Sequence, residues 1–317
     1  MTFHSLIESS EFRAADKGKS SGFISVPGTE VKMPATMING AAEGKQILIT
    51  GGVHGGEYPC IETAIQLAKE IDPADVSGNI LIIHPVNVPA FLAKLQYYGP
   101  YDGKNLNRVF PGKALGTTSE RIAYTVHQFQ KAADFFIDLH GGDIHESLVP
   151  FVIYSNLGGP ELAEQSKAAS AALGFPYVVG SVSDNGSIGA AAVAGTPGFL
   201  AELGQGGRWR PEEVKTYCDA TLNVLKHLKV LKTQPNVNDK VAFLSKMQVS
   251  FAGKDGCWYP SIKLQDVVSK GDKLGEIRDF FGNVIEEYFA ESGGVVLYLV
   301  TSLAIVSGDP LAAVGVE

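Results

Sequence analysis

An alternation of short apolar runs with helical patterns over residues 45–230 constrains the fold more than any other feature of this sequence. Short apolar runs bounded by turn residues predict strands at 46–50, 79–86, 134–140, 147–155, 176–180 and 197–203. Segments with an apolar residue every three to four positions predict helices at 59–71, 117–133, 159–174 and 211–231. Strands that alternate with helices favour parallel pairing. We therefore predict a layered α/β/α fold around a mostly parallel sheet.

The pattern changes after the segment LKTQPNVND (231–239). The remaining chain is rich in Gly, Val and Asp and has no helical periodicity. It also contains a weak internal echo, in which VSKGDKLGEI (268–277) resembles VSGDPLAAV (306–314). Repeated short strands with Gly-Asp turns are typical of a small β-barrel or sandwich. We predict an α/β domain over residues 1–231 and a small all-β domain over residues 232–317.

Charge and cysteine content limit the classes of function. The 317 residues carry a formal net charge of −8 without a Lys/Arg run, which argues against a nucleic-acid or membrane surface. No apolar stretch is long enough to span a bilayer, and the first residues do not form a secretory signal. Three widely spaced cysteines suit reduced thiols. We expect a cytoplasmic protein and leave its oligomeric state open, a homo-oligomer included.

Three residues of types that often bind metals lie at the ends of predicted strands. His54 and Glu57, in the glycine-rich stretch GGVHGGEYPC (51–60), follow one strand and precede a helix. His140 ends the strand DFFIDLH and precedes two glycines. Open α/β sheets place their sites at the carboxyl ends of strands. Two His and one Glu that leave a fourth position for water form a known catalytic zinc set. The sequence therefore predicts one Zn²⁺ per chain.

Glu202, in FLAELGQGG, ends another predicted strand before a glycine-rich turn. A carboxylate there that is not a ligand could accept a proton from a zinc-bound water. The alternative is ordinary structure, since a His after a strand is usually structural and Glu57 could simply favour a helix N-terminus. We assign four further histidines to structural roles: His84, His127, His145 and His227. His145 is close enough to His140 in the chain that the sequence leaves open whether it lines a pocket.

The motifs HGGE, NLNRVFPG (105–112), DLHGG and AELGQGG resemble the succinylglutamate desuccinylase/aspartoacylase family of zinc carboxypeptidase-like enzymes, along essentially the whole chain. The resemblance implies that His54, Glu57 and His140 are zinc ligands, and it implies a catalytic role for Glu202. It also implies that Asn107 and Arg108 bind a substrate carboxylate, which suits the bidentate fork of a guanidinium. A structural salt bridge is the alternative for Arg108. The C-terminal segment is similar to the small barrel-sandwich domain of that family.

Two departures from the family pattern affect the chemistry. Asn105 stands where relatives often have an Asp that supports a zinc-bound His; an amide oxygen can accept the imidazole N–H but adds no charge. The stretch QYYGPYDGK (96–104) offers tyrosines and Lys104 where some relatives carry another Arg. Oxyanion stabilisation then rests on zinc plus a tyrosine or on Arg108, and the sequence does not choose between them.

The sequence thus predicts a zinc hydrolase that removes an acyl group from the nitrogen of an amino acid or a similar small amine. A carboxypeptidase acting on short peptides would use the same residues with a wider site. A binding protein that retains only the fold is the alternative outside enzymes. The C-terminal turn RDFFGN lacks the Lys of a lipoyl-type carrier, which favours a packing or access-limiting role for that domain.

Overall fold

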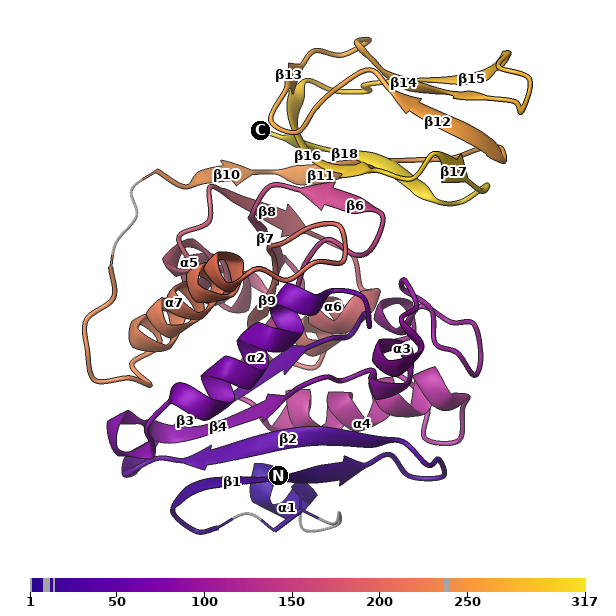
Figure 1. Cartoon of the computed structure of the whole chain (residues 1–317). Helices are drawn as coiled ribbons and strands as arrows, with labels where there is room; N and C mark the ends of the chain where they lie inside the picture. The colour runs from indigo at the N-terminus through magenta and orange to yellow at the C-terminus, as the bar shows by residue number, and fades with distance from the viewer. Residues whose placement is uncertain (1, 8–11, 14, 237–239) are drawn as a thin grey trace.

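The computed structural model describes residues 2–7, 12, 13, 15–236 and 240–317. Parts of the N-terminal segment and of the segment 231–239 lie outside the described residues. A nine-stranded mixed sheet forms the centre of the molecule, in the order β1-β2-β4-β3-β5-β9-β7-β8-β10 (Figure 1). Its strands are β1 (Gly18–Ser25), β2 (Lys32–Asn39), β3 (Ala42–Gly51), β4 (Ser77–Ile83), β5 (Phe135–His140), β7 (Phe151–Ser155), β8 (Tyr177–Ser181), β9 (Gly198–Glu202) and β10 (Ala242–Leu244).

Helices cover both faces of this sheet and give it two separate cores. On β3, Ile47 and Ile49 face one core while Leu48 faces the other, as the two-residue period of a strand requires. One core contains the apolar sides of α2 (Tyr58–Glu70), α5 (Pro160–Ala172) and α7 (Pro211–His227). The other contains those of α1 (Phe3–Ile7), α4 (Thr118–Ala132) and α6 (Gly186–Val193). Burial on both faces explains why the central strands are continuous apolar runs.

Short helical segments complete the α/β part. They are α3 (Val88–Ala93) and the 3₁₀ turns η1 (Pro73–Asp75) and η2 (Leu106–Arg108). Helix α4 begins with the predicted capping box, since the side chains of Thr117 and Glu120 both take part. Among the described residues, no helix is long and apolar enough to cross a membrane.

The C-terminal residues form two antiparallel sheets that lie over one end of the large sheet (Figure 1). One sheet has the order β11-β18-β16-β13, and the other has the order β15-β14-β12-β17. The strands are β11 (Lys246–Phe251), β12 (Gly256–Pro260), β13 (Val267–Val268), β14 (Lys273–Arg278), β15 (Val284–Phe289), β16 (Gly294–Val300), β17 (Ala304–Ile305) and β18 (Pro310–Val316). The domain division at residue 231/232 stays a prediction, while β10, which follows it, pairs with β8 of the large sheet.

The structure corrects two details of the predicted strands. Residues 147–155 form two strands, β6 (Glu146–Leu148) and β7, instead of one. Pro150 lies between them and has no N–H to donate to a strand ladder. Strand β6 pairs with β16 of the C-terminal part. The chain reaches β7 from β5 without a crossover helix, so β7 runs antiparallel to β9 and the sheet is mixed.

Tyr217 of α7 fixes the carboxyl ends of β5 and β9 to each other. Its fully buried hydroxyl donates to the carbonyl oxygen of Ala201 at 2.6 Å and accepts the backbone N–H of His140 at 3.3 Å. In the sheet, His140 and Glu202 are directly paired. One phenol therefore holds the two strand ends that carry these predicted site residues.

Removing this hydroxyl should destabilise the fold. Tyr217→Phe leaves a buried donor and a buried acceptor without their partner, so we expect the free energy of unfolding to fall by about 1–3 kcal/mol. Urea unfolding monitored by circular dichroism measures the change. Tyr101→Phe is the control, because Tyr101 is 71% exposed. Equal stability of Tyr217→Phe and wild type would contradict the proposed link between the strands.

Candidate metal and substrate site

Glycines let the chain turn sharply between β3 and α2. Gly52 has a φ of +75°, a region that side chains disfavour. A Cβ on Gly56 would collide with the carboxylate of Asp143. The bend therefore brings His54 and Glu57 back over the end of the sheet, where β5 ends with His140.

The predicted ligands His54, Glu57 and His140 meet in one buried group. Their ligand atoms all lie within 4.8 Å of one another. Nδ1 of His54 is 2.6 Å from Oε1 of Glu57, and Nδ1 of His140 is 3.1 Å from Oε2. Glu57 is the N-cap residue of α2, but its carboxylate makes no capping hydrogen bond and faces the two imidazoles instead. Two imidazole nitrogens and a carboxylate are a donor set that fits zinc.

The second nitrogen of each imidazole is held by an acceptor. Nε2 of His54 lies 3.0 Å from Oδ1 of Asn105, in the arrangement that the sequence predicts. Nε2 of His140 lies 3.2 Å from Oδ2 of Asp138, which is fully buried. Thr50 donates to the other oxygen of Asp138 at 2.6 Å, and Ser187 donates to Oδ2. Both rings are thus oriented with Nδ1 toward Glu57.

Our sequence reasoning missed Asp138. The signal was present, because residues two apart in a strand point to the same face and DLH therefore places Asp138 beside His140. Its effect differs from that of Asn105. A carboxylate makes the imidazole of His140 more basic, whereas the neutral amide only orients His54.

The charges of this group depend on one another. Burial alone would raise the pKa of Glu57, but the neighbouring His140 and His54 lower it to about 2. Burial acts to lower the pKa of His140, yet the charges of Glu57 and Asp138 outweigh it and raise that pKa. The site therefore holds Glu57 as an anion that requires positive charge beside it.

Glu202 lies next to this group at the end of β9, paired in register with His140. Its carboxylate is not among the three close ligand residues. Burial and the negative charge of Glu57 raise the pKa of Glu202. The position suits a group that exchanges protons beside the metal ligands without binding the metal itself.

Asn107 and Arg108 come from η2 and line the same cavity as the metal ligands. The side-chain oxygen of Asn107 accepts the backbone N–H of Ser187 at 2.8 Å, which fixes the turn against α6. Arg108 is exposed, and Nη1 donates to the carbonyl oxygen of Asn107 at 3.0 Å. Within the described part of the chain, the Arg108 guanidinium has no carboxylate partner in an ion pair.

The cavity has a volume of about 460 Å³, and residues of both the α/β part and the C-terminal part line it. The α/β part contributes most of the polar groups, including Glu202 and Arg108. The C-terminal sheet contributes the apolar side chains of Met247, Val249, Phe251, Pro310 and Ala313. The prediction that this domain limits access is consistent with that position. His145 is exposed and does not line the cavity.

Glu146, Tyr97 and Tyr298 form a polar wall of the same cavity, and the sequence did not single out Glu146 or Tyr298. Glu146 accepts hydrogen bonds from the hydroxyls of Tyr97 and Tyr298, the latter at 2.7 Å. Tyr97 belongs to the stretch whose tyrosines are one of the two alternatives, beside Arg108, for stabilising the oxyanion. Its hydroxyl donates to Glu146 in this structure, so it is already engaged.

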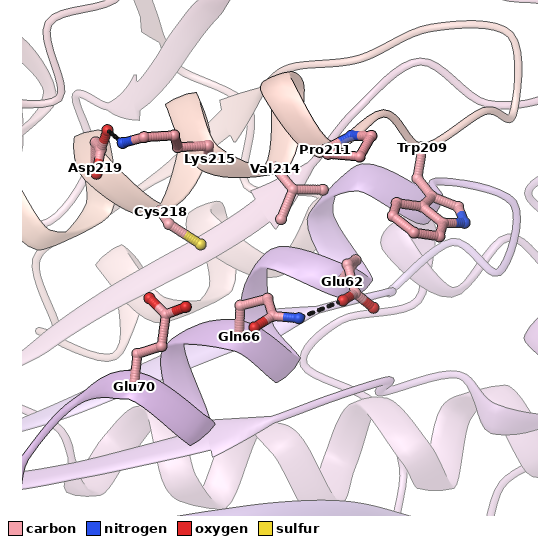
Figure 2. A pocket seen from close by; sticks show the side chains of 9 residues that line it. All are labelled: Glu62, Gln66, Glu70, Trp209, Pro211, Val214, Lys215, Cys218 and Asp219. Carbon is pink, nitrogen blue, oxygen red and sulfur yellow. Dashed lines mark hydrogen bonds and ion pairs between the residues drawn. The ribbon is translucent and has the colours of Figure 1, made fainter.

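A second pocket, of about 360 Å³, lies between α2 and α7 (Figure 2). Trp209 closes one end of it, and its polar groups largely pair with one another. Gln66 donates to Glu62 at 2.7 Å, and Lys215 lies 2.5 Å from Asp219. None of the predicted site residues lines this pocket. The predicted site residues line the other cavity, between the large sheet and the C-terminal sheets.

The chain is similar to known proteins along most of its length. The family model of the succinylglutamate desuccinylase/aspartoacylase catalytic domain matches residues 43–228. N-alpha-acetyl-L-2,4-diaminobutyric acid deacetylase from Halomonas elongata is 28% identical, with 94% of this chain and 91% of that protein covered.

Two solved structures are also similar along nearly their whole length. The product-bound ectoine utilization protein EutE (DoeB) from Ruegeria pomeroyi is 30% identical, with a TM-score of 0.86 and coverage of 97% and 98%. A succinylglutamate desuccinylase from Silicibacter is 29% identical, with a TM-score of 0.84 and coverage of 96% and 97%. These deacylase relatives support an N-acyl amino acid deacylase activity. Since the family model spans more than half of the sequence, the chain belongs to the succinylglutamate desuccinylase/aspartoacylase family.

Proposed function

We propose that this protein is a zinc-dependent deacylase that hydrolyses the amide bond of an N-acyl amino acid or a similar small acylated amine. The observation that carries the proposal is the buried group of His54, Glu57 and His140 beside Glu202 and Arg108 in one cavity. A zinc ion held by the three ligand residues would act as a Lewis acid and lower the pKa of a water molecule to about 7.

The remaining chemistry comes from side chains of this chain. Glu202 accepts the proton of the attacking water and returns it to the nitrogen of the leaving amine, so its carboxylate is regenerated. Arg108 binds the carboxylate of the amino acid, and Asn107 fixes the turn that carries it. Asp138 and Asn105 keep the imidazoles oriented throughout. We further place the enzyme in the cytoplasm, since Cys60, Cys218 and Cys257 are free thiols.

A carboxypeptidase acting on short peptides is the alternative. The apolar C-terminal sheet in the cavity wall favours a small substrate over an extended chain, because it takes part of the space that further residues would need. Incubation of the zinc-loaded protein with N-acetyl, N-succinyl and N-formyl amino acids beside dipeptides separates the two functions. Free amino acid released from the acylated compounds, and not from dipeptides, is the expected result.

The first prediction from this proposed function concerns the metal. Metal analysis of the purified protein should find about one zinc per chain, and His140→Ala should lose most of it, because a three-residue site cannot spare a ligand. His145→Ala is the control, since that exposed residue lies only five positions away. Full zinc content in His140→Ala would mean that His140 is not a zinc ligand.

The second prediction separates metal binding from proton transfer. Glu202→Gln should keep its zinc but lose about 10²–10⁴-fold in kcat, the usual contribution of a general base. Steady-state kinetics and metal analysis on the same sample give both values. Near-normal turnover with full zinc would mean that another group is the base.

The third prediction concerns Arg108. Each charge-assisted hydrogen bond contributes about 1.5–3 kcal/mol, so Arg108→Ala should sharply lower kcat/KM, and Arg108→Lys should recover little of it. The matched substrate is an analogue whose carboxylate is amidated. It should react poorly with wild type and show almost no further loss in Arg108→Ala. An equal loss for acid and amide would instead assign Arg108 to the oxyanion or to the fold.

A further inference from the structure

Strand β11 presents a partly exposed apolar stripe to the cavity. Met247, Val249 and Phe251 are two residues apart, so they lie on one face of the strand, and all three line the cavity. At the usual rise of a strand, the stripe is about 13 Å long. Phe251 is 56% exposed, while Val249 is half-buried and belongs to none of the apolar cores of the described residues. These side chains are therefore available to an apolar ligand.

The neighbouring strand β18 widens this stripe. Ala313 pairs directly with Val249, and Pro310 pairs with Phe251. Directly opposite residues of paired strands lie on the same face of a sheet, and both residues of β18 also line the cavity. Paired strands are about 5 Å apart, so the stripe becomes a surface two strands wide. We call it the apolar patch, and it consists of Met247, Val249, Phe251, Pro310 and Ala313.

The large sheet supplies a second apolar surface to the cavity, and this surface begins beside Glu202. Glu202 pairs directly with Phe151, and Leu200 pairs with Ile153 on the same two strands. All four side chains line the cavity. Met247 of the apolar patch packs against the apolar cluster that contains Phe151, so the two surfaces share one core at that end. Apolar space in the cavity therefore starts directly at the proposed general base.

The same space has no cation to spare. The only Lys or Arg side chain that lines the described cavity is Arg108, and the proposed function assigns it to the carboxylate of the amino acid. The acidic residues of the cavity are Glu57, Glu146 and Glu202. An acyl group that ends in a carboxylate would place a second negative charge among apolar side chains and carboxyl groups, and burial of an unpaired charge is costly. The cavity therefore favours an uncharged acyl group.

Building on the deacylase function proposed above, we propose that the apolar patch binds the acyl chain of the substrate, which is then an N-acyl amino acid whose acyl group is uncharged and longer than acetyl. Arg108 holds the amino acid on one side of the scissile bond, and the acyl chain extends from the other side. Each methylene group that leaves water for an apolar surface contributes favourable free energy, so the patch gives longer acyl chains an advantage. Met247, Val249 and Phe251 then determine the specificity for the acyl group.

The test compares N-acyl derivatives of alanine with the zinc-loaded protein. The N-acetyl, N-butanoyl and N-hexanoyl compounds differ only in the length of the acyl chain. We expect kcat/KM of wild type to rise by about two- to fourfold for each added methylene group. N-isocaproylalanine and N-succinylalanine have acyl groups of nearly equal shape, which end in two methyl groups and in a carboxylate, respectively. Wild type should favour the isocaproyl compound by about 10-fold or more.

Variants of the apolar patch locate this effect. Val249→Thr exchanges one methyl group for a hydroxyl group, and it should lower the ratio of kcat/KM for hexanoyl over acetyl by about threefold. Met247→Gln replaces a thioether by a polar amide and should lower the ratio further, by about 10-fold. Val284→Thr is the matched control, because Val284 is 49% exposed in β15 and does not line the cavity. If Met247→Gln does not fold, Val249→Thr carries the same comparison.

A second pair of substrates tests which side of the scissile bond meets the patch. N-acetylalanine and N-acetylnorleucine differ only in the side chain of the amino acid. We expect Val249→Thr to leave the ratio of kcat/KM for this pair unchanged. A preference for the norleucine compound that Val249→Thr removes would place the amino acid side chain on the patch and overturn the assignment to the acyl chain.

Calorimetric titration adds a readout that needs no turnover. In ketomethylene analogues of the substrates, a methylene group replaces the amide N–H, so the enzyme cannot hydrolyse them. The hexanoyl analogue should bind to wild type more tightly than the acetyl analogue, and Val249→Thr should reduce this difference by about threefold.

The outcomes separate this inference from the deacylase function. Hydrolysis of N-acetylalanine without a gain for longer acyl chains, or a gain that both patch variants retain in full, overturns the apolar acyl site and leaves the deacylase intact. Tighter binding of the hexanoyl analogue that Val249→Thr reduces, without hydrolysis of any N-acyl amino acid, supports the apolar site and overturns the deacylase. Neither hydrolysis nor tighter binding of the longer analogue overturns both.

Discussion

The carboxylate of Glu57, shared between the imidazoles of His54 and His140, is the interaction on which the rest of the site depends. It requires β3 and β5 to be parallel neighbours whose carboxyl ends coincide, as the pairing of Gly51 with Leu139 ensures. It also requires a bend that only glycine permits at Gly52. A carboxylate that is 2% exposed is stable only beside positive charge, which a protonated His140 or a bound metal ion would supply at this point of the fold.

The sequence predicted this centre because its residues stand at strand ends. An apolar run followed by a polar residue and glycine marks such an end locally, and the βα order places successive ends at one edge of the sheet. The same local reasoning could not find the mixed sheet. Strands β1 and β2 precede the regular alternation, and β7 turns back because no helix precedes it. Pairing direction depends on connections that a window of sequence does not contain.

The sequence could not predict the polar wall at Glu146, for a related reason. Its partners Tyr97 and Tyr298 lie 49 and 152 positions away along the chain. The stretch QYYGPYDGK contains Tyr97 but does not indicate which of its tyrosines faces the cavity, and Tyr298 lies in β16, whose sequence is typical of an ordinary core strand. The pairing of β6 with β16 brings them together. The C-terminal part therefore contributes a polar group to the cavity as well as apolar cover.

The charges of the cavity indicate what it accepts. Its carboxylates are Glu57, Glu146 and Glu202, whereas its permanent cation is Arg108. A divalent cation held by His54, Glu57 and His140 would compensate the charge of Glu57 directly and, through its own charge, would favour the ionised form of Glu202. Burial raises the pKa of Glu146, whose carboxyl group accepts the hydroxyls of Tyr97 and Tyr298, so Arg108 is left as the charged group of the cavity without an ion-pair partner in the described chain. A substrate carboxylate at Arg108 would supply that partner, as the proposed N-acyl amino acid does.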